Sequence, residues 1–208
     1  MLTIKVRQEA MVTDGAIYSL LQESYQLWTA NGIDAPFLHD TLEGFVRRIK
    51  RAVVFVAMDA ENGELLGVHA FLPYKRQGYL FGGLLAVSPS AQGQGIATRM
   101  LEEESRRARM NGYRYLKGTT AVKAVWSVRW HLKNGYRIVG YKRSSGSSCA
   151  NYVFRKQLVP SLLWDSSLFC RCCYLASYVI TKLTKDSNGH PNLVGRMLKK
   201  IIGKSKAQ

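Results

Sequence analysis

Residues 85–98 read Leu-Ala-Val-Ser-Pro-Ser-Ala-Gln-Gly-Gln-Gly-Ile-Ala-Thr, the end of an apolar strand followed by a turn with two glycines and the start of a helix. Helix N-termini present unpaired backbone N–H groups and a partial positive charge, so they bind phosphate groups. Gly93 and Gly95 let an anion approach the backbone without a clash from Cβ, and Thr98 adds a hydroxyl donor. The stretch matches neither the Gly-x-Gly-x-x-Gly pattern of dinucleotide-binding folds nor the Gly-Lys-Ser/Thr of a P-loop.

The elements on either side of this stretch predict a mixed α/β domain. Alternating apolar and polar residues indicate strands, and apolar residues three or four positions apart indicate amphipathic helices. Strands are expected over residues 2–7, 53–58, 65–73, 79–87, 115–120, 136–141 and 151–155, and helices over 14–29, 40–51, 95–111 and 123–133. Gly82 and Gly83, inside a strand, indicate a bulge or a close approach of another backbone.

At roughly 150 residues per domain, the 208 residues predict one domain over 1–159 and a basic amphipathic helical extension over 160–208. Apolar residues between 193 and 202 recur at helical spacing after Asn192, a candidate helix cap. Two interpretations of this extension stay open. It packs on the domain or on a partner chain, or it lies on an anionic membrane surface together with the aromatic residues between 164 and 178.

The net charge is +16, from 30 basic and 14 acidic residues, and it calls for an acidic partner: a polyphosphate cofactor, nucleic acid or an anionic membrane. No nucleic-acid-binding motif occurs in the sequence, so nucleic acid is not expected. No signal-peptide pattern is present, and the most apolar window, 162–180, contains Asp165 and Arg171. We therefore expect a cytoplasmic protein, with a peripheral position at the inner face of the membrane as an alternative.

Cys170, Cys172 and Cys173 include one Cys-x-x-Cys, but no second pair stands at zinc spacing. No metal site is expected.

The pattern Gln/Arg-x-x-Gly-x-Gly/Ala is matched by Gln92, Gly95 and Ala97. Through this pattern the chain resembles the GNAT superfamily of acyl-CoA-dependent N-acyltransferases. Ala86-Val87-x-Pro89 precedes this match, and Asn134-Gly135-Tyr136, about 40 residues later, resembles the family's tyrosine-x-x-x-Gly-Phe element. The resemblance covers about three-quarters of the chain. It implies a mixed, mostly antiparallel central sheet with splayed middle strands, flanked by helices.

The resemblance also implies how the donor, acetyl-CoA or another acyl-CoA, is bound. The backbone of Leu85, Ala86 and Val87 would pair with the pantetheine arm and polarise the thioester carbonyl. The residues that would cradle the pyrophosphate are Gln92, Gly93, Gln94, Gly95, Ile96, Ala97 and Thr98. Gly82-Gly83 stand where the family has its strand bulge. Weaker candidates for the adenosine phosphates are Arg99, Lys123 and Arg129.

The catalytic positions depart from the family pattern. Gly83 and Leu84 stand where many members carry a carboxylate base, and His131 aligns with the tyrosine that protonates the departing thiolate. His131 is therefore the candidate acid, and His69 or Tyr79 are candidate bases. Attack by a neutral amine on a held thioester depends mostly on positioning and carbonyl polarisation, so transfer survives these departures.

The leading hypothesis is an acyl-CoA-dependent N-acyltransferase acting on the primary amine of a small molecule, such as an amino sugar or an amino acid. One alternative is a catalytically degenerate acyl-CoA-binding module, held at a membrane or on a partner by its extension. Another is an acetyltransferase of protein N-termini or lysines. The oligomeric state is not predicted.

Overall fold

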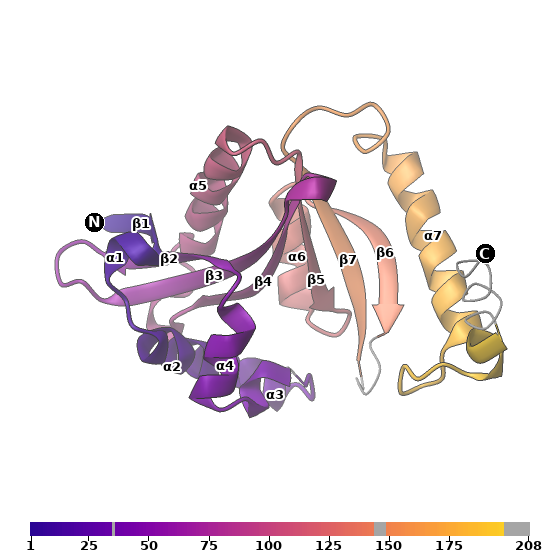
Figure 1. Cartoon of the computed structure of the whole chain (residues 1–208), viewed down its shortest axis with the longest axis horizontal. Helices are drawn as coiled ribbons and strands as arrows, with labels where there is room; N and C mark the ends of the chain where they lie inside the picture. Colours follow the sequence, from indigo (N-terminus) through magenta and orange to yellow (C-terminus); the bar gives the residue numbers. More distant parts are fainter. Residues whose placement is uncertain (35, 144–148, 198–208) are drawn as a thin grey trace. The chain divides into compact units, whose positions relative to one another are not determined.

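The computed structural model describes all residues except 35, 144–148 and 198–208 (Figure 1). Its described residues form two compact units. The first unit consists of Met1–Gly118 with Lys156–Pro160, and the second of Thr119–Arg155 with the segment that begins at Ser161. Each unit is defined by its internal contacts and combines two separate stretches of the chain. The expected domain boundary at residue 159 therefore stays a prediction.

Seven strands form one mixed sheet in the order β1-β2-β3-β4-β5-β7-β6. The strands are β1 (Leu2–Val6), β2 (Val53–Asp59), β3 (Leu65–Tyr74), β4 (Tyr79–Val87), β5 (Tyr115–Ala121), β6 (Arg137–Arg143) and β7 (Ala150–Gln157). β4 and β5 pair in parallel, whereas β1–β2, β2–β3, β3–β4 and β6–β7 are antiparallel. The expected mixed, mostly antiparallel sheet flanked by helices is confirmed.

The helices are α1 (Arg7–Ala10), α2 (Asp14–Ser24), α3 (Gln26–Ala30), α4 (Leu42–Ile49), α5 (Ile96–Met110), α6 (Val125–Lys133) and α7 (Ser167–Thr184). Short 3₁₀ turns are η1 (Pro36–His39), η2 (Lys75–Gln77) and η3 (Pro89–Ala91). The single helix expected over 14–29 is wrong, since Tyr25 divides it into α2 and α3. Tyr25 has φ −92° and ψ 2°, and its buried ring packs edge-on against Phe37 with the centroids 4.7 Å apart.

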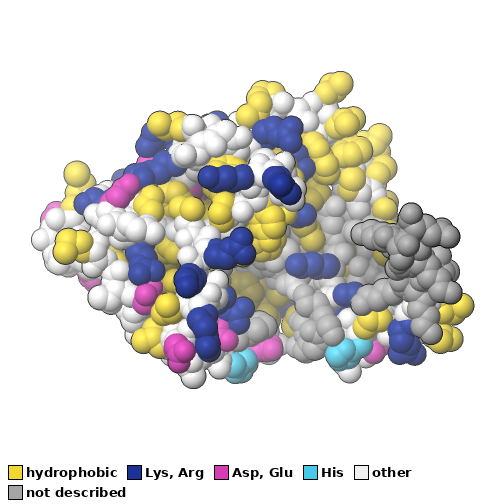
Figure 2. Space-filling model, viewed as in Figure 1, with side chains coloured by type: hydrophobic (Ala, Val, Ile, Leu, Met, Phe, Trp, Pro, Cys, Tyr) yellow, Lys and Arg dark blue, Asp and Glu magenta, His cyan; other side chains and the backbone are white. Residues whose placement is uncertain are grey.

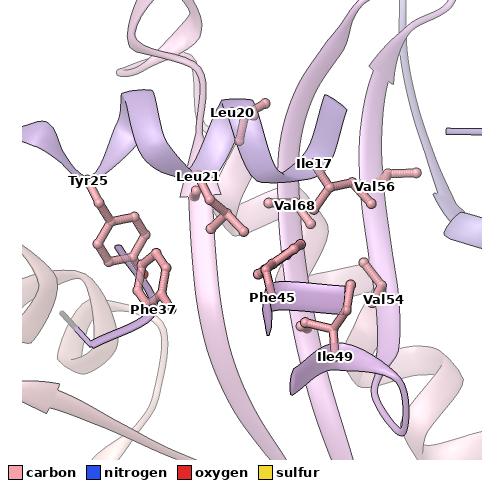
Figure 3. Close-up of a cluster of buried hydrophobic side chains, with 12 residues drawn as sticks. Ile17, Leu20, Leu21, Tyr25, Phe37, Phe45, Ile49, Val54, Val56 and Val68 are labelled. Atoms are coloured by element: carbon pink, nitrogen blue, oxygen red, sulfur yellow. The ribbon is translucent and has the colours of Figure 1, made fainter. Parts of the chain in front are cut away.

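In the first unit, α2 and α4 cover one face of β2 and β3, as Figures 1 and 3 show. Ile17 and Leu21 from α2 and Phe45 from α4 meet the two strands in a buried cluster. Val68 of β3 belongs to this cluster, so its neighbours Gly67 and His69 face the opposite side of the sheet. α5 packs there, because a Cβ on Gly67 would lie 3.0 Å from Met100 Sδ.

In the second unit, α7 covers the edge strand β6. The Tyr141 backbone N–H donates to Ser177 Oγ at 2.7 Å, and Thr181 Oγ1 donates to the Tyr141 carbonyl at 3.2 Å. These side chains satisfy backbone groups that an edge strand would otherwise leave unpaired. This side of α7 therefore packs on the sheet, which is one of the two arrangements expected for the extension.

After α7, the Gly195 N–H donates to Asn192 Oδ1 at 2.9 Å, as expected for the cap of the next helical segment. The predicted continuation of that segment to residue 202 lies largely outside the described residues. Among the helices that the structure describes, none is long and apolar enough to cross a membrane.

Candidate active site

The turn between β4 and α5 contains two glycines in the left-handed region. Gly93 has φ +80° and Gly95, the N-cap of α5, has φ +76°. L-residues with a side chain rarely adopt this conformation, which explains the glycines. A Cβ at either position would meet no atom within 4 Å, so both backbones face open space.

The first turn of α5 presents backbone N–H groups to that space. The amides of Thr98 and Arg99 both donate to the Gly95 carbonyl at 3.0 Å. No hydrogen bond among the described residues uses the amides of Gly95, Ile96 or Ala97. Unpaired amides at the positive end of a 15-residue helix fit a diphosphate. The exposed Arg99 lies within this turn and can add positive charge.

Gln92 connects this turn to the end of β4. Its side-chain Nε2 donates to the Val87 carbonyl at 3.2 Å. Of the other residues expected to cradle the pyrophosphate, Gln94 is exposed, Ile96 is buried, and Ala97 and Thr98 are half-buried. The loop therefore approaches an anion mainly through backbone, while Gln92 holds its position relative to the strand.

β4 contains a bulge opposite His69. Val68 pairs with Ala86 and Ala70 with Gly83, so β4 holds one extra residue between these pairs, and Leu84 takes φ +56°. The bulge expected at Gly82-Gly83 thus lies one or two residues later. Gly82 has a different role, because a Cβ there would lie 2.7 Å from Phe71 Cε1 and 3.0 Å from His69 Nε2.

Beyond Gly82, β4 leaves its parallel neighbour. Pairing of β4 with β5 covers Tyr79–Gly82, and β4 continues to Val87. The Ser88 N–H donates to the Leu66 carbonyl at 2.8 Å. In an antiparallel pair of strands, every second residue points its N–H and carbonyl toward the partner strand. The N–H and carbonyl of the preceding residue, Val87, therefore point away from β3. The end of the pairing with β5 at Gly82 is the feature expected of splayed strands that admit a pantetheine arm.

Helix α2 braces this part of β4 through two side chains that the sequence analysis did not identify as site residues. Ser24 Oγ donates to the Val87 carbonyl at 3.0 Å, and Tyr25 Oη donates to the Leu85 carbonyl at 3.1 Å. Burial raises the pKa of Tyr25, so its hydroxyl stays protonated and able to donate. The only sequence signal was the place of Tyr25 on a buried helical stripe.

His69, a candidate base, is buried under α5. It is 5% exposed, and its Nδ1 lies 3.0 Å from Oε2 of Glu104, which is fully buried. The His69 ring also packs against Phe71, with the centroids 4.1 Å apart. Glu104 Oε1 has no hydrogen-bond partner among the described residues. These contacts favour a structural role for His69, and its role as a base stays a prediction.

Tyr79, the other candidate base, lies in a stack of three tyrosines across β3, β4 and β5. Its ring centroid is 4.7 Å from that of Tyr74 and 5.0 Å from that of Tyr115, and Lys117 Nζ lies 5.6 Å from its ring. Burial raises the pKa of Tyr79. A higher pKa reduces the population of the phenolate at neutral pH, which disfavours Tyr79 as a base.

His131, the candidate acid, lies on α6 in the second unit. Its Nδ1 is 2.7 Å from the Ser127 carbonyl, which can only accept, so Nδ1 carries a hydrogen. The ring stacks on Phe154, with the centroids 4.5 Å apart. The role of His131 as the acid stays a prediction.

Residues 50–138 match the sequence profile of the acetyltransferase (GNAT) domain, and this range holds β2 to α6 with the whole β4–α5 turn. Residues 50–138 are therefore similar to the acetyltransferase domain of the GNAT superfamily. This similarity supports an acyl-CoA-dependent N-acetyltransferase.

Solved structures of acetyltransferases share its fold. The ribosomal-protein-S18-alanine N-acetyltransferase from Escherichia coli is 14% identical, with a TM-score of 0.60, 77% of this chain and 96% of that chain covered. The IAA acetyltransferase from Bacillus cereus is 19% identical, with a TM-score of 0.57 and coverages of 76% and 99%. A Salmonella typhimurium protein with its cofactor acetyl-CoA is 16% identical, with a TM-score of 0.57 and coverages of 77% and 96%. No curated protein matches the chain.

Proposed function

We propose that this protein transfers an acetyl group from acetyl-CoA to the primary amine of a small molecule, such as an amino sugar or an amino acid. The space beside Gly83 carries this proposal. A Cβ on Gly83 would meet nothing within 4 Å, and Gly83 directly precedes the bulge at which β4 leaves β5. The open space for a compact acceptor is therefore the space beside Gly83 itself, since its cross-strand neighbour Ala70 is buried in the core cluster.

Acetyl-CoA supplies a thioester whose carbonyl carbon forms a bond to the amine nitrogen and whose sulfur leaves as a thiolate. In this proposal, the α5 N-terminus holds the diphosphate, and the backbone amides of Leu85 and Val87 polarise the carbonyl. The acid expected from the sequence to protonate the leaving sulfur is His131. The amine nitrogen passes its extra proton to a base, for which His69 and Tyr79 stay the candidates, or to water.

Replacement of the acid tests the role of His131. His131→Phe keeps an aromatic ring against Phe154 but cannot donate a proton. We expect kcat to fall roughly 100-fold or more, the usual contribution of general acid–base catalysis. Acetyl-CoA binding, measured by thermal unfolding, should stay unchanged.

His131→Tyr is the matched control, since a tyrosine hydroxyl is also an acid. It should recover much of the rate lost in His131→Phe and shift the pH profile of kcat. An unchanged kcat in His131→Phe would remove His131 from the mechanism.

Filling the space beside Gly83 tests the acceptor site. Gly83 has an ordinary φ, so Gly83→Leu is tolerated by the backbone, and its side chain would occupy the proposed amine position. We expect kcat/KM for amines to fall at least tenfold, since misplacement by about 1 Å costs about 100-fold. Gly83→Ala should give a smaller loss. Full activity in Gly83→Leu would place the acceptor elsewhere.

The acceptor class is tested by release of free CoA with amino sugars, free amino acids and short lysine-containing peptides. Faster release with the small amines supports the proposal, and faster release with peptides supports the protein acetyltransferase. Acetyl-CoA binding without turnover by any amine would support the degenerate binding module. A peripheral position on a membrane through residues 160–208 stays a prediction from the sequence.

A further inference from the structure

The side of α7 that faces away from the sheet is an exposed apolar stripe. Its members recur at helical spacing and are each at least half exposed: Leu168, Leu175, Val179, Ile180 and Leu183. Leu162 and Leu163 extend this α7 stripe ahead of the helix, and Leu162 is 94% exposed. Figure 2 shows hydrophobic side chains gathered over the first half of α7. Contiguous exposed apolar surface of this kind marks an interaction site.

The orientation of α7 within its unit keeps this stripe outward. Ser177 and Thr181 hold the opposite side of the helix to the Tyr141 backbone, and Gly140 allows the close approach, since a Cβ there would lie 3.4 Å from Ser177 Oγ. Tyr178 packs on Tyr141 from the same side, with the centroids 4.9 Å apart. The stripe therefore cannot turn inward without loss of these contacts.

Basic residues border the α7 stripe. Arg171 and Lys182 are both exposed and, at 100° per residue, fall along the same border of the stripe, and α7 contains no Asp or Glu. The second unit as a whole holds 15 of the 30 basic residues and only 2 of the 14 acidic ones. Most of the net positive charge of the protein thus belongs to the unit that carries the stripe.

We propose that the α7 stripe docks on an anionic phospholipid membrane, with its leucines at the boundary of headgroups and acyl chains and Arg171 and Lys182 among the phosphates. An apolar helix face bordered by cations is the pattern of helices that lie in a membrane interface. Self-association through the stripe would bring two strongly positive units together, which like-charge repulsion opposes. The proposal does not depend on the acceptor or on the acid of the transfer reaction.

Vesicle co-sedimentation of the full chain tests this docking. Wild type should sediment with vesicles of phosphatidylcholine mixed with phosphatidylglycerol, and much less with phosphatidylcholine alone. Leu175→Glu/Val179→Glu should weaken binding at least tenfold by removing apolar burial. Arg171→Gln/Lys182→Gln should weaken it about tenfold by removing two cations and should flatten its salt dependence.

Met11→Glu/Met110→Glu is the matched control, because it puts the same charges at two exposed apolar positions of the first unit. It should bind vesicles nearly like wild type, and all variants should keep the thermal shift with acetyl-CoA. Absence of wild-type binding, or equal binding by Leu175→Glu/Val179→Glu, overturns the proposal. So does a wild-type dimer that this variant dissociates in sedimentation velocity, because the stripe would then bind a second copy.

Discussion

Gly95→Glu is expected to abolish the stabilisation that acetyl-CoA gives to the protein. The glutamate would fill the open space at the N-terminus of α5 and place a negative charge where the diphosphate binds. At 100 times Kd, acetyl-CoA should stabilise wild type by about 2.7 kcal/mol, which corresponds to roughly 5–10 °C in Tm for a protein of this size. Thermal unfolding with and without acetyl-CoA should show this shift in wild type and none in Gly95→Glu.

Gly95→Ala is the control for the backbone. It carries the same strain at φ +76° but leaves most of the space open, so it should lower the Tm of the free protein and keep a shift with acetyl-CoA. A full shift in Gly95→Glu would mean that the donor does not bind at the N-terminus of α5.

His69→Leu should destabilise the protein more than most single substitutions. It leaves the fully buried Glu104 carboxyl without its partner, and loss of the partner of a buried polar group costs about 1–3 kcal/mol, or more where the group is charged. We expect Tm to fall by roughly 10 °C, measured by circular dichroism at fixed pH. A typical single hydrogen bond contributes about 1 kcal/mol to the free energy of unfolding. A loss of stability below that value would show that the pair contributes little.

The double variant His69→Leu/Glu104→Leu separates pairing from packing. Replacement of a buried polar pair by apolar side chains of similar volume is often close to neutral, so the double variant should be more stable than His69→Leu alone. If the loss of stability in the double variant instead equals the sum of the losses in the two single variants, the two side chains act independently.

The sheet and the donor loop could be predicted because their signals are local. The apolar run that ends at Ser88-Pro89-Ser90 indicated β4, and Gly93 and Gly95 marked the anion-binding turn through a backbone requirement that few other residues meet. The sequence predicted one helix over 14–29, because nothing local shows that Tyr25 turns inward to reach Leu85.

Contacts between distant segments were not predictable in the same way. Glu104 lies 35 residues after His69, and its burial follows from the packing of α5 on β3. The bracing of β4 by Ser24 and Tyr25 spans 60 residues or more. Gly82 and Gly83 predicted a bulge or a close approach at one place, whereas the bulge follows Gly83 and the rings of His69 and Phe71 require the glycine at 82.

Hydrogen exchange with and without saturating acetyl-CoA reports directly on the backbone amides that are proposed to bind the donor. We expect slower exchange with acetyl-CoA at two places: the β4–α5 turn, residues 93–98, and the part of β4 beyond its pairing with β5, residues 85–87. Exchange in α7 should stay unchanged. Unaltered exchange in both segments at saturating acetyl-CoA would show that the donor does not bind there.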